Sequence, residues 1–129
     1  MNSTTLLNAA AALIFLVGLA HSYLGERFIL VRLFKRPDLP HLFGSAEFTT
    51  RTLRFAWHLT TLAWWGFALL LLMIRDGTIT TREVAGVVVD LAALSGLVVL
   101  VWSRGKHLAW LAFFVIAALV YAAFGSVPA

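Results

Sequence analysis

The sequence predicts an all-α integral membrane protein, folded as an antiparallel four-helix transmembrane bundle with both termini outside. Of its 129 residues, 61% are hydrophobic and 12% are charged, about half the charged share of a typical soluble domain. The apolar residues form long unbroken runs, which favours spanning helices over alternating strands. A single domain is therefore expected over residues 1–129, without the polar surface that water requires.

Four helices are expected, at residues 5–31, 50–74, 80–102 and 106–124. Each is close to the length of about 20 residues that crosses the hydrocarbon layer. Pro37 and Pro40 end the first helix, and Gly77 makes a turn after the second. Thr80 or Thr81 should cap the third helix by accepting a hydrogen bond from an early backbone N–H. The first apolar run is expected to be a retained helix, because no basic residue precedes it as in a signal peptide.

The basic residues predict which side of the membrane each connection faces. Arg75 and Arg82 lie around the second connection, whereas the other basic residues lie around the first and third. The latter are Arg27, Arg32, Lys35, Arg36, Arg51, Arg54, Arg104 and Lys106. Because cytoplasmic loops carry the excess of Lys and Arg, these two connections should face the cytoplasm. The loop at residues 32–49 is expected to lie along the cytoplasmic headgroup layer.

Composition also limits the location and the partners. The net charge of +4 is explained better by membrane orientation than by nucleic-acid binding. The expected location is the cell inner (plasma) membrane, as a multi-pass protein whose first partner is the lipid bilayer. Small residues offer faces for a homo-oligomer or a larger membrane complex, namely Ala92, Gly96, Ala118 and Ala122. The absence of cysteine removes disulfides and thiolate metal sites.

Five ionisable residues fall inside the expected spans, where such groups are costly and are functional candidates by default. They are His21, Glu26, His58, Asp90 and His107. Measured from the outer end of each helix, the three histidines lie about 24, 24 and 27 Å deep. Glu26 is expected closer to the cytoplasm and Asp90 near the middle of the bilayer. The three histidines are therefore predicted to turn toward one another in the cytoplasmic half.

The first functional hypothesis is an intramembrane metal site. Neutral imidazoles bind zinc, iron or copper, so His21, His58 and His107 are the expected ligands. Glu26 or Asp90 would complete or orient the set. No HExxH spacing or other catalytic signature occurs, so the sequence does not establish whether the protein is an enzyme.

A second hypothesis is a redox subunit that binds b-type haem or a quinone. Two histidines on different helices could ligate the iron axially, and Arg51 and Arg54 could hold the propionates. The third histidine would then be available to a quinone. Transport or proton relay through Asp90 and the histidines is a third class. A purely structural role for the polar residues is a fourth.

The first helix carries a groove of small residues, Gly18, Ser22 and Gly25, that would let a neighbouring helix approach closely. His21 and Glu26 flank this groove, about 140° apart on a regular helix. Each histidine also has a structural explanation: a neutral His58 would be satisfied by a hydrogen bond to Ser22 or Tyr23. The sequence leaves these alternatives open.

Overall fold

The computed structural model describes residues 2–124 and contains helices only, apart from connecting turns. In chain order the elements are α1 (Ser3–Leu24), a π-helical turn η1 (Gly25–Leu30), α2 (Val31–Leu33), α3 (Glu47–Arg75), α4 (Thr81–Ser103) and α5 (Ala109–Phe124). Because α1, η1 and α2 follow one another without a break, they form one long helix with a widened turn near its end. The predicted all-α class is confirmed.

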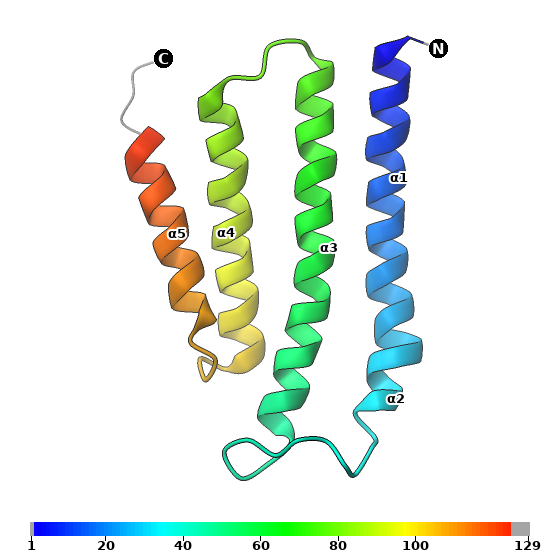
Figure 1. Cartoon of the computed structure of the whole chain (residues 1–129), viewed down its shortest axis with the longest axis vertical. Coiled ribbons are helices and arrows are strands. Elements are labelled where there is room, and N and C mark those ends of the chain that lie inside the picture. The colour runs from blue at the N-terminus through cyan, green and yellow to red at the C-terminus, as the bar shows by residue number, and fades with distance from the viewer. Residues whose placement is uncertain (1, 125–129) are drawn as a thin grey trace.

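The long helices lie side by side in sequence order and form a row (Figure 1). Among residues 2–124, α1 packs against α3, α3 against α4 and α4 against α5, and no other pair of these helices is in contact. Each helix runs opposite to its neighbour, and α1 begins at the end of the molecule where α5 finishes (Figure 1). The antiparallel four-helix order is as predicted, in an open arrangement instead of a closed one.

Three helical segments are long and apolar enough to cross a membrane, namely Ser3–Leu33, Glu47–Arg75 and Thr81–Ser103. They indicate a multi-pass membrane protein in contact with the bilayer. The last helix, α5, has 16 residues, about 24 Å at the α-helical rise and thus shorter than the hydrocarbon layer. Its predicted start at residue 106 is wrong, because Arg104 (φ 52°) and Gly105 (φ 76°) reverse the chain and delay the helix to Ala109.

The other helix ends lie close to their predicted positions. The third expected helix begins at Thr81, and the Thr80 hydroxyl accepts a hydrogen bond from the Glu83 backbone N–H at 3.2 Å. The Glu83 carboxylate accepts one from the Thr80 N–H at 2.8 Å, which completes a reciprocal cap. The predicted cap at Thr80 is therefore confirmed. The second helix starts at Glu47, before its predicted start, and shortens the first connection.

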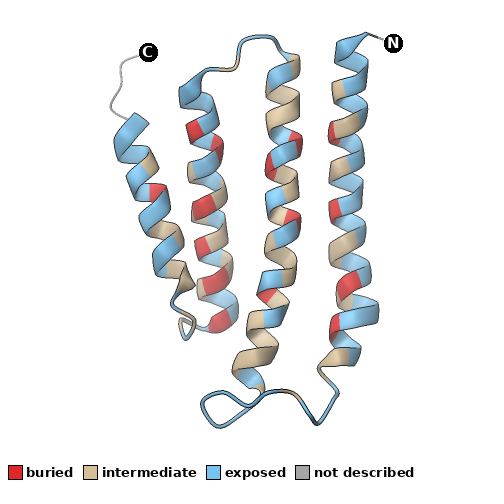
Figure 2. Cartoon of the chain, viewed as in Figure 1, coloured by how far each residue is buried: buried red, intermediate tan, exposed pale blue. Residues whose placement is uncertain are grey.

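The contact between α1 and α3 is built on small residues facing large ones. Two such pairs match along the antiparallel helices, Gly18 with Trp65 and Gly25 with Trp57, and between them Ser22 meets Thr61. A Cβ atom on Gly18 would lie 2.6 Å from Trp65 Nε1, and a Cβ atom on Gly25 would overlap the Trp57 indole. The predicted groove thus receives the aromatic side chains of α3 directly. On α4 the buried residues Ala92, Gly96, Val99 and Ser103 recur every three or four residues and form a stripe along the helix (Figure 2).

The π-helical turn lies where the polar residues of α1 gather. In it the Val31 N–H donates to the Glu26 carbonyl, five residues back, so this turn holds one more residue than an α-helical turn. Just before it, Trp57 Nε1 donates a hydrogen bond of 3.1 Å to the His21 carbonyl. Single π-helical turns are rare and occur frequently at functional sites.

Candidate functional site

Glu26 is the centre of a polar cluster between α1 and α3. Arg54 approaches its carboxylate with two nitrogens, Nε at 3.2 Å from Oε2 and Nη2 at 3.0 Å from Oε1. His58 Nε2 lies 3.4 Å from Glu26 Oε2. The side chains of Glu26 and Arg54 are each about one third exposed, at 35% and 33%. One carboxylate therefore joins the arginine and the histidine of α3 to the widened turn of the first helix.

Hydroxyl groups continue this cluster along the first helix toward its N-terminus. His58 Nδ1 lies 2.9 Å from Ser22 Oγ, and Ser22 Oγ lies 2.8 Å from Thr61 Oγ1. The buried Thr61 hydroxyl in turn donates to the Gly18 carbonyl at 3.3 Å. The side chains of Thr61, Ser22, His58, Glu26 and Arg54 thus form one continuous hydrogen-bonded chain. The sequence-based alternative that Ser22 satisfies His58 agrees with this geometry.

The direction in which the two hydroxyl groups donate determines which nitrogen atoms of His58 must carry a proton. If Thr61 donates to Gly18, Ser22 must donate to Thr61, and His58 Nδ1–H must donate to Ser22. His58 then reaches Glu26 as a donor only when Nε2 also carries a proton, that is, as the imidazolium. If both hydroxyls reverse, Ser22 donates to Nδ1 and a neutral His58 donates from Nε2 to Glu26. The same atoms therefore accommodate His58 with one proton or two.

A pocket of about 540 Å³ opens beside this chain. Its polar lining comes from Ser22, Tyr23, Glu26, Arg27 and His58, and its apolar lining from Leu19 and Val31. Pockets of this size are typical of small-molecule sites, which combine apolar walls with a few polar groups. Tyr23 is 66% exposed, so the pocket is open toward the outside of the helix row. The hydrogen-bonded chain is thus accessible to a ligand from outside the helix row.

His21 does not join this chain. Its ring stacks on Trp57, with centroids 4.5 Å apart and planes 2° apart, and a second indole, Trp64, lies 4.9 Å away. Its Nε2 atom is buried and has no hydrogen-bond partner. Because the small residues of the first helix face α3, the His21 ring points to one side of this contact, where it packs between Trp57 and Trp64.

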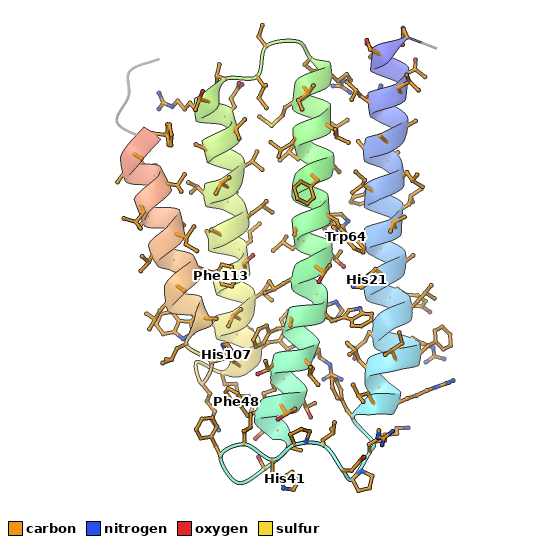
Figure 3. The ribbon with its side chains drawn as sticks, viewed as in Figure 1. His21, His41, Phe48, Trp64, His107 and Phe113 are labelled. Atoms are coloured by element: carbon orange, nitrogen blue, oxygen red, sulfur yellow. The ribbon has the colours of Figure 1, made fainter. Side chains whose placement is uncertain are left out.

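His107 lies on the other side of α3 from His21, as the labelled side chains in Figure 3 show. It precedes α5, and its Nδ1 accepts a hydrogen bond of 3.3 Å from the Ala109 N–H. Its ring stacks on Phe48 at 5.5 Å and meets the edge of Phe55 at 5.1 Å. His107 therefore acts as a cap for α5 and as a packing residue against α3.

Asp90 is separate from all of these groups. It is exposed on α4 and lines a hollow of about 240 Å³ that also includes Arg82 of α4 and Tyr121 of α5. Its azimuth on α4 points it toward α5 and away from α3. The predicted partnership of Asp90 with the histidines is not formed.

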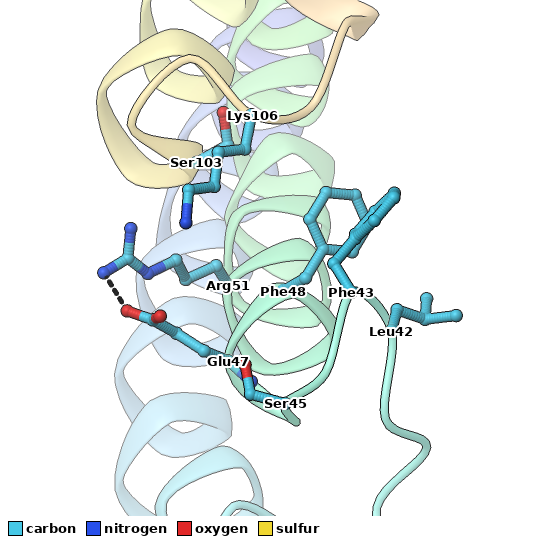
Figure 4. Close-up of a pocket in the computed structure, with 8 residues that line it drawn as sticks. All are labelled: Leu42, Phe43, Ser45, Glu47, Phe48, Arg51, Ser103 and Lys106. Atoms are coloured by element: carbon cyan, nitrogen blue, oxygen red, sulfur yellow. Dashed lines mark hydrogen bonds and ion pairs between the residues drawn. The ribbon is translucent and has the colours of Figure 1, made fainter.

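The remaining predicted residue, Arg51, forms an ion pair with Glu47 one turn earlier. Both line a second pocket of about 360 Å³ between the first connection and the α4–α5 turn, drawn in Figure 4. Its other lining residues are Leu42, Phe43, Ser45, Phe48, Ser103 and Lys106. Arg51 thus lies at the basic end of the molecule, about one turn beyond Arg54.

The predicted metal ligands do not come together. Among residues 2–124, no group of three or more His, Cys, Asp or Glu side chains is placed to hold a metal ion. The shared depth of the three histidines was insufficient, because α3 separates His21 from His107. Both ring nitrogens of His58 already have protein partners, and His21 Nε2 is closed off, which disfavours axial haem ligation by this pair.

Three contributors to the site were not predicted: Thr61, Trp102 and the π-helical turn. Thr61 could have been found from sequence, because it lies one turn from both Trp57 and Trp65 on the face that meets the small residues. Trp102 stacks on His58 at 5.9 Å from the neighbouring helix α4. Comparison with known protein families, curated proteins and solved structures gave no match for this chain.

Proposed function

We propose that this multi-pass membrane protein binds the polar head of a lipid-soluble quinone in the pocket beside His58. The observation that carries the proposal is the hydrogen-bonded chain Thr61–Ser22–His58–Glu26–Arg54, which borders a pocket open at the outside of the helix row. Quinones dissolve in the bilayer and reach such a pocket laterally. Their head groups need both hydrogen-bond donors and a proton acceptor.

The lining residues supply both. The Tyr23 hydroxyl and the Arg27 guanidinium can donate to the carbonyl oxygens of the oxidised head group. In the reduced form, a quinol hydroxyl donates to the Glu26 carboxylate. Leu19 and Val31 give the ring and the start of the isoprenoid tail an apolar surface.

The position of the site also supports the proposal. Glu26 and Arg54 lie at the basic end of the helices, which we propose faces the cytoplasm. The Glu26 side chain is itself about one third exposed at this end, so protons can reach it from that aqueous side. On the other side the chain ends at the Gly18 carbonyl. The cluster is therefore better suited to exchange protons between one aqueous side and a bound ligand than to conduct them across the membrane.

The test uses the purified full chain in detergent, titrated with a short-tailed quinone whose binding is measured from the rise in the unfolding temperature. We expect saturable binding, weakened about tenfold or more in Glu26→Gln, which removes the proton acceptor. Asp90→Asn is the matched control, since it neutralises a carboxylate outside the cluster. The alkyl tail without a head group should produce no saturable shift.

Three outcomes would contradict the proposal. The first is equal weakening by Glu26→Gln and Asp90→Asn, and the second is the absence of a saturable shift in the wild-type chain. The third is a Soret band in the absorption spectrum of the purified protein that disappears in His58→Ala, which would favour haem.

A further inference from the structure

A further pocket, distinct from the one beside His58 and from the one that Glu47 lines, is lined by three arginines. Arg51, Arg54 and Arg104 surround about 330 Å³ together with Val101 and Trp102, and no carboxylate lines it. Arg51 and Arg54 come from α3, and Arg104 from the end of α4. Like charges gathered around one hollow repel one another, so the arrangement favours an anion between them.

The arginines retain unused donors for such an anion. Arg54 uses Nε and Nη2 for Glu26, and Arg51 uses Nη2 for Glu47. Arg104 has no ion pair with any residue in the described range 2–124. A guanidinium carries five N–H donors and matches the tetrahedral oxygens of a phosphate in two-point contacts. The two glutamates neutralise two of the three charges from outside the pocket, which leaves a net positive charge at Arg104.

The rest of the lining indicates where the phosphate comes from. Val101 is 64% exposed and Trp102 is 41% exposed, so apolar surface lies next to the charged groups. Tryptophan at the end of a span is typical of the headgroup level. Arg54 lies seven residues into α3, about 10 Å from its first residue, a depth suited to lipid phosphates. An anionic lipid offers both a phosphate and an apolar portion to this surface.

We propose that the pocket formed by Arg51, Arg54 and Arg104 binds a phosphate oxyanion, supplied by the headgroup of an anionic lipid. Arg104 is the residue that makes the site selective for anions, because its charge is not balanced by a protein carboxylate. Trp102 lines this pocket and stacks on His58, which lines the other pocket, so the two pockets are linked through this contact. The proposal does not depend on quinone binding.

The experiment measures the unfolding temperature of the full chain in detergent against three probes: short-chain phosphatidylglycerol, short-chain phosphatidylcholine and inorganic phosphate. We expect a saturable rise with phosphatidylglycerol and none with phosphatidylcholine. Arg104→Gln should weaken this binding about tenfold, whereas Arg104→Lys should retain most of it. Arg32→Gln is the control, since it removes an exposed arginine from the same end of the molecule.

The probes distinguish the source of the phosphate. A rise with phosphatidylglycerol alone supports a lipid headgroup. A rise with inorganic phosphate that competes with the lipid supports the oxyanion site but transfers it to a soluble phosphate compound. Equal weakening by Arg104→Gln and Arg32→Gln would mean general attraction to basic charge and would overturn the proposal. So would the absence of a saturable rise with every probe.

Discussion

The indole of Trp57 lies directly against Gly25, and its Nε1 donates a 3.1 Å hydrogen bond to the His21 carbonyl one turn earlier. This contact brings α3 close to the first helix at the point where the helix widens. The same closeness lets His58 and Arg54, the next polar residues along α3, reach Glu26. The polar cluster therefore depends on Gly25, because only a residue without a side chain lets Trp57 approach this closely.

Gly25→Ala is expected to destabilise the chain, since the added Cβ would overlap the Trp57 indole. Overpacking of this kind costs about 1–3 kcal/mol. Gly86→Ala is the matched control, because a Cβ there meets no atom within 4 Å. That control should be neutral or stabilising by up to about 1 kcal/mol, the helix preference of Ala over Gly. Unfolding in mixed detergent micelles measures both, and equal effects would refute the contact.

Substitution by phenylalanine should have opposite effects on stability at the two histidines between α1 and α3, His21 and His58. His21→Phe keeps the stack on Trp57 and removes a buried nitrogen without a partner, so stability should hold or rise. His58→Phe leaves Ser22 and Glu26 without a hydrogen-bond partner on that side. Its expected cost is about 1–3 kcal/mol. A loss in His21→Phe as large as that in His58→Phe would show that Nε2 has a partner in the membrane.

Glu26 and Arg54 should be energetically coupled. In a double-mutant cycle of Glu26→Gln and Arg54→Gln, we expect a coupling free energy of about 1 kcal/mol, because both side chains remain partly exposed. The same cycle with Arg27 in place of Arg54 is the control, since Arg27 is a neighbour of Glu26 in sequence on the exposed side of the first helix. A coupling near zero for both pairs would contradict the ion pair.

The orientation in the membrane can be tested with engineered cysteines, because the chain has none of its own. A membrane-impermeant thiol reagent should label Asn2→Cys in intact cells and Ser45→Cys only after the membrane is opened. The physical reason is the concentration of Lys and Arg around the first and third connections. Labelling of Ser45→Cys alone in intact cells would reverse the orientation.

The fold was more predictable than the site. Long apolar runs and the turn residues gave the helices and their order, and Thr80 with Glu83 gave a helix start. The depth of each histidine followed from the helical rise, but depth does not determine which neighbour a side chain faces. His107 illustrates this limit, because its position in a turn before α5 removes it from the regular geometry on which the estimate relied.

The matching of small and large residues between α1 and α3 was available in the sequence on both helices. Gly18, Ser22 and Gly25 predict a groove on the first helix, and Trp57 and Trp65 are large residues on one face of the second. Their spacing of two turns fits that groove in antiparallel register. The π-helical turn has no comparable signal in the sequence, because it depends on tertiary contacts such as that of Trp57 with Gly25.

The extra residue held by the turn Gly25–Leu30 gives the first membrane segment two angular registers. Each α-helical residue advances the side-chain direction by about 100°, so one added residue rotates everything beyond it by that amount relative to a uniform helix. The groove before the turn faces α3. The direction of the basic residues beyond the turn is set by the extra residue and not by the groove. Shortening this segment by one residue would therefore reorient Arg32 and Lys35 while leaving the glycine contacts in place. The apolar part and the charged part of the segment can thus change separately during evolution.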